Sequence, residues 1–315
     1  MIPPILESYT STAGRKEDIL DLITSVSPED TPFLTRLGVS KASSTYHEWL
    51  TDELVNNVSG DALIEGDSAK AHLLTDKTRY ASYTQISDRT FQISGTEEAV
   101  SHYGLDSQYA YQLEKAMKEL KIKMERILLG SSASGAGTTT ATSRTTRGAF
   151  ETARTWGSGS SGAASVSALT ESIYNDTLQA LFVLGANPNT TFVPGYLKRR
   201  ISAFATPNTR TIDMSSSKKL TGVVSIYESD FGVQEVILDR WVCGIRKSGV
   251  EGTDTGSGLI VDMSKLKIAY LRKPFTNPLA VDGDRKAVQI LTEYTLETLA
   301  PTQLGYLSAF ATATV

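Results

Sequence analysis

The longest regular pattern of apolar positions runs through residues 105–129. Apolar side chains recur there at steps of three and four residues, as on one face of a helix. These positions are Leu105, Tyr109, Leu113, Met117, Leu120, Met124 and Ile127. At about 1.5 Å per residue the helix would be about 37 Å long. We expect it to pack with one side on a sheet. A dimeric coiled coil is the alternative, and three heptads are the lower limit for that structure.

Charged residues on the same segment support the helix. Glu114 with Lys118, and Glu119 with Lys123, stand in the i, i+4 order in which an acid precedes a base. Pairs in this order stabilise a helix by a few tenths of a kcal/mol each. The segment therefore predicts a helix with one apolar and one charged side.

A second pattern, typical of extended chain, occupies residues 45–94. Residues 45–50 and 79–94 are rich in the aromatic and β-branched side chains that favour strands. Residues 56–61 and 65–67, between them, have the composition of turns. We therefore predict a long β-hairpin with an outgoing and a returning arm.

The predicted hairpin is too long to fold back on its own chain. Arms of roughly 15–20 residues at about 3.3 Å each would reach about 50–65 Å, whereas a compact chain of this length has a diameter of about 50 Å. A two-stranded ribbon alone is marginally stable, so we expect it to lie on a neighbouring copy. Phe91 and Ile93 are out of phase with Thr84 and Ile86, which predicts a bulge at 87–90.

Two short helices are expected before the hairpin. Residues 19–26 carry a helical apolar face. Pro28 follows Ser27 and precedes two acids, which predicts the start of a second helix that ends at Gly38.

The middle of the chain predicts alternating elements. Residues 131–168 are rich in Gly, Ser and Thr and are expected to form an exposed loop or insertion. A helix over 169–184 is expected to end at Gly185. A short buried strand at 191–193 and a helix that begins at Pro194 follow.

The C-terminal third is mostly strand. The predicted strands are 223–227, 233–238, 259–262, 266–271 and 288–297. In the last of them the two faces alternate over about ten residues, the upper end of ordinary strand length. The order of arm, hairpin, helix, mixed middle and β-rich end predicts an α+β fold.

Composition narrows the function. With 40% hydrophobic and 21% charged residues the chain is an ordinary folded protein. Its net charge of −4 lacks the basic excess of proteins that grip nucleic acid, so any contact with DNA should be weak. Cys243 is the only cysteine, which excludes an intramolecular disulfide and suggests a buried, inert thiol. No signal peptide or membrane-spanning segment is expected, and a reducing cytoplasm is the expected compartment.

No catalytic, cofactor or metal site is predicted. Asp254-Thr255-Gly256 matches the aspartic protease triplet but follows polar residues rather than an apolar strand, so we interpret it as a loop. The three histidines have no zinc-site spacing, and His47 is expected to pack between subunits. The basic cluster 198–200 is interpreted as a solvated helix face, with an anion or subunit contact as the alternative. We therefore predict that the protein is not an enzyme.

Several motifs follow one another along the chain: Asp30-Thr31-Pro32-Phe33, Glu48 to Leu54, Thr84-Gln85-Ile86, Phe91 to Thr96, and Gly185 with Pro188 and the helix after Pro194. In this order they resemble the motifs of tailed-bacteriophage major capsid proteins with the Hong Kong 97-type fold. The resemblance covers nearly the whole chain. The Gly/Ser/Thr-rich run after the long helix is its least typical part.

The resemblance implies a division into five parts. Residues 1–42 would form an N-terminal arm and residues 43–96 an extended β-hairpin loop. Residues 97–190 would form a peripheral domain with a spine helix and the Gly/Ser/Thr-rich insertion. Residues 191–262 would form an axial domain, and residues 263–315 the return strands of the peripheral domain.

The function implied is that of a virion structural protein. Such a subunit self-assembles in the host bacterial cytoplasm, through hexamers and pentamers, into a head shell that encloses double-stranded DNA. A separate scaffolding protein, a portal and a decoration protein would be its partners. An encapsulin-like compartment shell, a phage tail protein and, more remotely, a hydrolase with the Asp254 triplet are the alternatives.

The hairpin and arm supply the residues expected at contacts between subunits. The predicted contact residues are Phe33, Trp49, Leu50, Leu54, Tyr80 and Tyr83.

Overall fold

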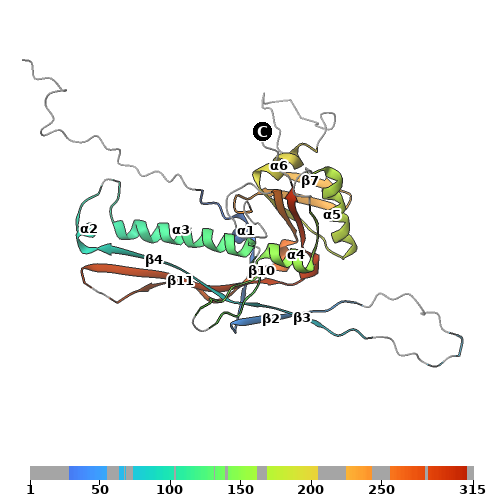
Figure 1. The fold of residues 1–315 in the computed structure, drawn as a ribbon, viewed down its shortest axis with the longest axis horizontal. Helices are drawn as coiled ribbons and strands as arrows, with labels where there is room; N and C mark the ends of the chain where they lie inside the picture. Colours follow the sequence, from blue (N-terminus) through green and yellow to red (C-terminus); the bar gives the residue numbers. More distant parts are fainter. Residues whose placement is uncertain are drawn as a thin grey trace, which may run out of the picture.

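The computed structural model of the protein describes residues 28–54, 64–66, 68, 74–102, 104–130, 132–138, 141–161, 169–204, 225–242, 256–280 and 283–310. Over these residues the chain has a mixed α/β fold with a four-stranded sheet, a six-stranded sheet and a separate two-stranded ribbon. Figure 1 shows the four-stranded sheet and its long helix as an elongated layer, with the six-stranded sheet at one end.

The elongated layer is built on the four-stranded sheet. Its strands lie in the order β1 (Gly38–Lys41), β10 (Leu266–Pro278), β11 (Arg285–Thr298) and β4 (Gln85–Ser94). β1 is parallel to β10, and the other pairs are antiparallel. Apolar side chains of β10 and β11 form one core cluster with the long helix, so one face of the sheet is buried.

The long helix α3 (Gln108–Leu129) covers this sheet, as predicted. It begins three residues later than expected, because the Ser107 hydroxyl accepts a hydrogen bond from the Ala110 N–H and caps the first turn. Leu120, Met124 and Leu128 are buried in the core. The coiled-coil alternative is wrong, since the apolar side of α3 packs on β4 and β11 of the same chain.

Two details of the predicted helix differ in the structure. Met117 belongs to the predicted stripe but is 43% exposed. The Glu114–Lys118 pair forms at 2.9 Å, whereas Glu119 pairs with Arg89 of β4 at 2.8 Å. The charged side of α3 therefore forms one ion pair with the edge strand β4 and one within the helix.

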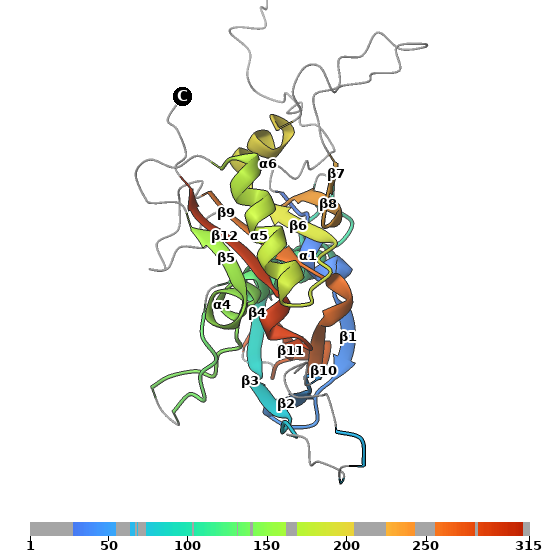
Figure 2. The same ribbon diagram turned by 90° about the vertical axis from the view of Figure 1, so that its right-hand side faces the viewer.

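The six-stranded sheet forms the compact end of the molecule. Its order is β5 (Ser158–Ser161), β12 (Gly305–Phe310), β9 (Gly256–Val261), β6 (Thr190–Val193), β8 (Gly232–Leu238) and β7 (Ile226–Ser229). Helices α5 (Glu171–Val183) and α6 (Gly195–Ser202) pack on it around a second core cluster. Figure 2 shows α5 across the strands of this sheet. Helix α4 (Ala149–Trp156) lies beside β5 and joins the first core.

The predicted elements of this region are largely confirmed. Gly185 ends α5 with a φ of 77°, a conformation that favours glycine. The strand at 191–193 is fully buried, and Pro194 caps the next helix. The predicted C-terminal strands correspond to β7 to β11, whereas β1, β5 and β12 are strands that were not predicted.

The Gly/Ser/Thr-rich run is not a simple loop. Within its described part, residues 149–156 form α4 and residues 158–161 form the edge strand β5, parallel to β12. A Cβ atom at Gly157 or Gly159 would collide with the carbonyl oxygen of Leu304 or Tyr306. Glycine is required here because the backbone lies directly against its neighbour.

The predicted helix after Ser27 begins in the wrong place. Residues 28–31 are not helical, and α1 (Pro32–Arg36) starts at Pro32 instead of Pro28. The cause is distant in sequence, because the Glu125 carboxyl accepts the N–H groups of Phe33 and Leu34. The predicted helix at 19–26 lies outside the described residues.

The returning arm of the predicted hairpin is divided at Thr84. Only β3 (Thr78–Tyr83) pairs with the outgoing strand β2 (Tyr46–Thr51), over six residue pairs. Beyond Thr84 the chain enters β4 and pairs with β11 instead. The expectation of two arms of roughly 15–20 residues each is therefore wrong for the described ladder.

The predicted bulge is also wrong. The register of β4 with β11 is continuous from Gln85↔Tyr294 to Ser94↔Arg285. Phe91 and Ile93 face α3, whereas Ile86 points to the opposite face and is 47% exposed. The change of phase in the sequence reflects one apolar residue on the outer face rather than an inserted residue.

Candidate functional site

The β2–β3 ribbon projects from the body of the molecule. In Figure 1 it runs from beneath β10 and β11 in the direction opposite to α3. The side chains of its paired residues alternate between an inner face toward the body and an outer face. We call the outer face, made of Tyr46, Glu48, Leu50, Arg79, Ala81 and Tyr83, the ribbon surface.

The inner face is held by the chain's own residues. The Tyr80 ring lies against Trp156 of α4 with centroids 5.1 Å apart. The Arg147 N–H donates to the Ser82 hydroxyl at 3.1 Å. The Tyr83 N–H donates to the Ser134 hydroxyl at 2.8 Å. The Gly/Ser/Thr-rich run of residues 131–168 thus supports the ribbon through its described part.

Two buried carboxylates of β11 anchor the base of the ribbon. Glu293 accepts hydrogen bonds from the Thr84 hydroxyl at 2.8 Å, Arg144 at 2.6 Å and Arg272 at 2.9 Å. Its side chain is only 4% exposed. Because both guanidinium groups converge on one carboxylate, the strand junction at Thr84 is fixed by charge-assisted hydrogen bonds.

Glu297 binds the outgoing strand at the same face of β11. It accepts hydrogen bonds from the Ser40 hydroxyl at 2.5 Å and from His47 Nε2 at 3.3 Å. The hydrogen bond from His47 lowers the pKa of Glu297, with Ser40 acting in the same direction and burial opposing it. The His47 ring lies beside Glu297 and Trp49 of its own chain, and its side chain is 16% exposed. Its packing between subunits stays a prediction.

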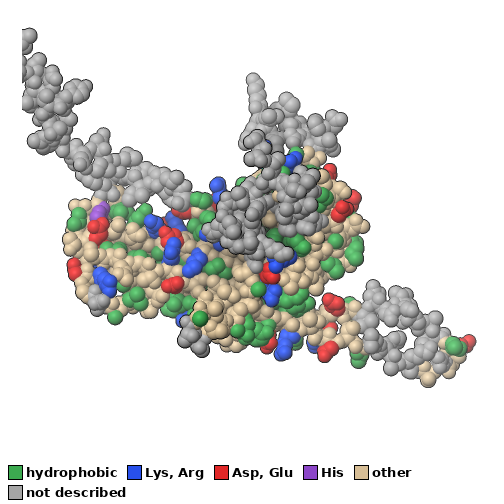
Figure 3. Space-filling view, in the orientation of Figure 1, with side chains coloured by type: hydrophobic (Ala, Val, Ile, Leu, Met, Phe, Trp, Pro, Cys, Tyr) green, Lys and Arg blue, Asp and Glu red, His purple; other side chains and the backbone are tan. Residues whose placement is uncertain are grey.

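The ribbon surface is exposed and partly apolar. Leu50 is 62% exposed, and Leu54, just beyond the ladder, is 99% exposed. Tyr46 and Tyr83 stack with centroids 4.6 Å apart, and Glu48 lies 3.5 Å from Arg79. Figure 3 shows hydrophobic and charged side chains side by side where the ribbon leaves the body. Such a mixture can bury apolar area and still fix the register of a partner.

The structure divides the six predicted contact residues into three kinds. Leu50 and Leu54 are exposed, as a contact residue must be. Trp49, Tyr80 and Tyr83 are half-buried against their own chain. Phe33 has no exposed surface and packs edge-on against Phe192, so its interpretation as a contact residue is wrong.

Sequence reasoning missed the buried acids. Glu293 and Glu297 occupy positions that alternation assigns to the solvent side of a strand. Glutamate is uncommon in strands, and two of them four residues apart were the available signal. Glu125 was signalled in another way, because it stands three and four residues before the apolar Leu128 and Leu129 on the same side of α3.

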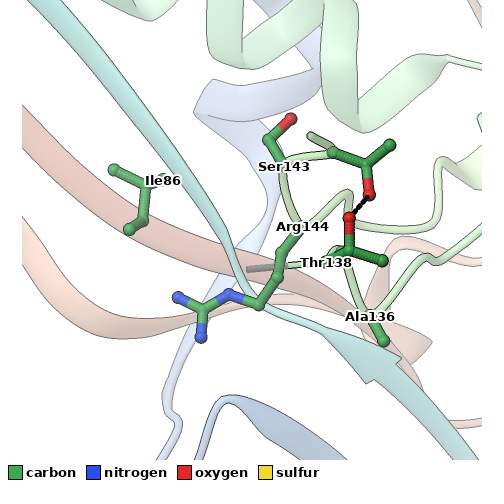
Figure 4. A pocket seen from close by; sticks show the side chains of 7 residues that line it. Ile86, Ala136, Thr138, Ser143 and Arg144 are labelled. Carbon is green, nitrogen blue, oxygen red and sulfur yellow. Dashed lines mark hydrogen bonds between the residues drawn. The ribbon is translucent and has the colours of Figure 1, made fainter. Parts of the chain in front are cut away.

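A shallow hollow lies near the base of the ribbon, between β4 and the loop before α4. Its lining residues are Ile86, Ala136, Gly137, Thr138, Thr142, Ser143 and Arg144. Figure 4 shows the Arg144 side chain extending away from Thr138, whose hydroxyl bonds that of Thr142 at 2.9 Å. Arg144 is the one charged group of this lining and is already paired with Glu293, so the hollow offers no acid–base chemistry.

The other sites considered in the sequence give no centre for chemistry. Among the described residues, no group of His, Cys, Asp and Glu could hold a metal ion. Cys243, His72, Asp254 and Thr255 lie outside the described residues, so their interpretations stay predictions. In the basic cluster, Lys198 donates to the Val236 carbonyl and Arg200 to the Tyr196 hydroxyl. No helix in the described part of the chain is long and apolar enough to cross a membrane.

Comparison with known proteins decides the family. The model of the SU10 major capsid protein family matches residues 6–311. The chain belongs to this family. Major capsid proteins are structural subunits of the virion, so the prediction that this protein is not an enzyme is confirmed. Membership also decides against an encapsulin-like compartment, a tail protein and a hydrolase.

A curated relative agrees with this family. The major capsid protein of Escherichia phage Phieco32 is 32% identical over 131 residues, which cover 42% of this chain and 37% of that protein. The match therefore spans well under half of the relative's length.

Solved structures show the fold. A chain from Gordonia phage Cozz superposes with a TM-score of 0.66 at 12% identity and covers 99% of this chain and 98% of that one. A chain of the cyanophage A-1(L) capsid asymmetric unit gives a TM-score of 0.64 at 13% identity, over 98% and 100%. The fold is thus the mixed α/β fold of Hong Kong 97-like phage capsid proteins.

Proposed function

We propose that this chain assembles, through hexamers and pentamers of itself, into the closed head shell of a tailed phage around double-stranded DNA. Family membership supports the role of a shell subunit. The observation within this chain that carries the proposal is the β2–β3 ribbon, which is anchored firmly at its base and exposes an apolar surface beyond it.

The ribbon surface has the chemistry of a contact that another copy completes. Full burial of an exposed leucine side chain contributes about 1.5–3 kcal/mol of stability. Leu50 and Leu54 are mostly exposed in the single chain, so most of this free energy is available to a contact with another copy. In a closed symmetric shell the same contact repeats at every subunit, so a modest gain at each contact multiplies. Trp49 and Tyr80 support this surface from the inner face of the ribbon, and Tyr83 contributes contact area on the ribbon surface itself.

The division into parts follows the same proposal. Residues 1–42 are the arm, 43–96 the hairpin loop, 97–190 and 263–315 the peripheral domain, and 191–262 the axial domain. The pairing of β4 with β11 favours a shorter loop that ends at Thr84, with β4 counted in the peripheral sheet.

Partners other than the chain itself follow from the role of a shell subunit. A scaffolding protein and a portal would direct closure. A decoration protein would bind the finished shell, as the solved structure of phage G, with its major capsid and decoration proteins, illustrates for that phage (TM-score 0.54, 8% identity, over 96% of this chain and 100% of that one). The net charge of −4 favours weak contact with packaged DNA.

Electron microscopy and native mass measurement of the full-length chain test the proposal. Capsomers or closed shells are expected from the wild-type protein. The double variant Leu50→Asp, Leu54→Asp should stay monomeric, because aspartates on the ribbon surface and just beyond it would be desolvated in a contact.

The matched control is the double variant Leu50→Met, Leu54→Met, which keeps apolar volume and should assemble. Both variants should unfold at the wild-type temperature, since neither position is buried in the chain. Normal shells from the aspartate variant would contradict the role of the ribbon surface.

A further inference from the structure

Two carboxyl groups meet in the interior where α1, α3 and the end of β8 come together. Glu125 projects from the buried side of α3, and Asp239 follows the last residue of β8. Both residues have no exposed surface. Burial of an ionised carboxyl group costs free energy unless each of its oxygens accepts a hydrogen bond, and protonation removes that cost. The hydrogen-bond donors around the four oxygens therefore indicate whether the pair carries a proton.

Three backbone N–H groups supply donors to the pair. Phe33 N–H donates to Glu125 Oε1 at 2.8 Å, and Leu34 N–H to Oε2 at 2.6 Å. Trp241 N–H donates to Asp239 Oδ1 at 2.8 Å. Each of these N–H groups ties a different piece of chain to the pair.

The fourth oxygen is the informative one. Asp239 Oδ2 is buried and has no N–H or O–H donor among the described residues. The charge of Asp239 acts directly on the Glu125 carboxyl, so the two buried carboxyl groups face each other. Two ionised carboxylates cannot bond each other, but a protonated carboxyl donates. One proton between Glu125 and Asp239 therefore satisfies the remaining oxygen.

The same place holds the chain segment around α1. The Trp241 indole N–H donates to the Asp30 carbonyl at 2.7 Å. Phe33 is buried in the core beside Phe192, and Arg36 forms a bidentate pair with Glu235 of β8 at 2.6 and 2.7 Å. Residues 30–36 are thus docked on both the long helix and the six-stranded sheet.

We propose that Glu125 and Asp239 share one proton and act as a pH-sensitive latch that holds residues 30–36 on α3 and β8. Opening the latch releases that proton, so the latch weakens as the pH rises. The proposal concerns the folded chain itself and stands whether or not the ribbon surface is an assembly contact.

The direction of the pH dependence follows from the environment of the pair. Burial first, and the charge of Asp239 second, raise the pKa of Glu125 from its ordinary 4.5 to about 8, against the lowering effect of the Leu34 and Phe33 N–H groups. Burial also raises the pKa of Asp239. When the latch opens, Glu125 returns to its ordinary pKa of 4.5. Between about pH 4.5 and 8 opening therefore releases a proton, and it becomes easier as the pH rises.

Other charged groups of the packed elements have their own partners or face outward. Glu29 pairs with Lys118, and Arg126 lies over the Trp241 ring at 6.0 Å. Lys198 bonds the Val236 carbonyl, and Lys121 and Arg240 are exposed. The charge that acts on Glu125 is that of Asp239.

Hydrogen exchange of the full-length chain, read by mass spectrometry at pH 6.5 and 8.5, tests the latch directly. After correction for the intrinsic pH dependence of exchange, protection of residues 31–37 should fall at least about tenfold at the higher pH. Protection of α5 is the internal reference and should not change, because the described residues of its core include no pair of buried acids.

Asp239→Asn is the decisive variant. The asparagine amide would donate permanently to an ionised Glu125, and its oxygen would still accept the Trp241 N–H, so protection of 31–37 should be equal at both pH values. Glu114→Gln, an exposed acid on the same helix, is the matched control and should keep the wild-type pH dependence. Equal wild-type protection at both pH values, or unchanged pH dependence in Asp239→Asn, would overturn the proposal.

Discussion

The long helix α3 and the β2–β3 ribbon both extend from the compact end of the molecule, in opposite directions (Figure 1). The helix is covered by apolar side chains of its own sheet. The ribbon is fixed by buried carboxylates at its base and leaves leucines exposed beyond it. The helix buries its apolar side within one chain, whereas the ribbon is fixed in position with an apolar surface that its own chain does not cover. Substitutions in the two elements should therefore have different effects on the stability of the single chain.

The largest loss of stability is expected on the helix side. Leu128 is fully buried between α3 and the sheet. Leu128→Ala should lower the free energy of unfolding by about 2–5 kcal/mol, because it removes buried apolar area and leaves a cavity. Urea denaturation of the unassembled chain measures this, with Met117→Ala as a control on the exposed side of the same helix. Equal losses in both variants would contradict the one-sided packing.

A smaller loss is expected at the base of the ribbon. Glu293→Ala should cost about 2 kcal/mol, since it leaves two partly exposed arginines without their shared carboxylate. Hydrogen exchange should show the loss chiefly in residues 78–83. Glu48→Ala, at an exposed ion pair of the ribbon, is the control and should leave that protection unchanged. If exchange rose mainly in α3 instead, Glu293 would not be an anchor of the ribbon.

Glu297 at the base of the ribbon and the Glu125–Asp239 pair should respond to pH in opposite directions. The pKa of Glu297 is lowered, chiefly by His47, so its contribution is present above its ordinary value of 4.5 and lost as the pH falls through the lower folded value. His47→Ala should therefore move the acid-induced loss of ribbon protection to a higher pH. Exchange of residues 46–51 between pH 3 and 6 measures this shift, and identical profiles in the two proteins would refute it.

The smallest effect is expected on the ribbon surface. Arg79→Gln breaks an exposed pair with Glu48 and should change the free energy of unfolding by less than about 0.5 kcal/mol. Urea denaturation measures it. A loss of 2 kcal/mol or more would mean that the ribbon surface stabilises the chain itself.

Local patterns in the sequence were sufficient wherever a residue's partner is periodic or nearby. The stripe of α3 and the glycine that ends α5 are such features. The division of the returning arm at Thr84 is different, because its cause is Glu293, which lies 209 positions along the chain. The same holds for the start of α1, which depends on Glu125, 92 positions from Phe33. Composition also misled at Gly157 and Gly159, where glycine marks close backbone contact and not a loop.

The direct passage from β3 into β4 has a mechanical consequence. Only Thr84 separates the ribbon from a strand that pairs with β11 without interruption from Gln85 to Ser94. A tension along the ribbon would be carried along the axis of β4, across the direction of its hydrogen bonds to β11. That ladder would have to yield in shear, with its bonds loaded together rather than one at a time. A force on the ribbon would therefore be transmitted to the four-stranded sheet beneath α3 before β4 could separate from β11.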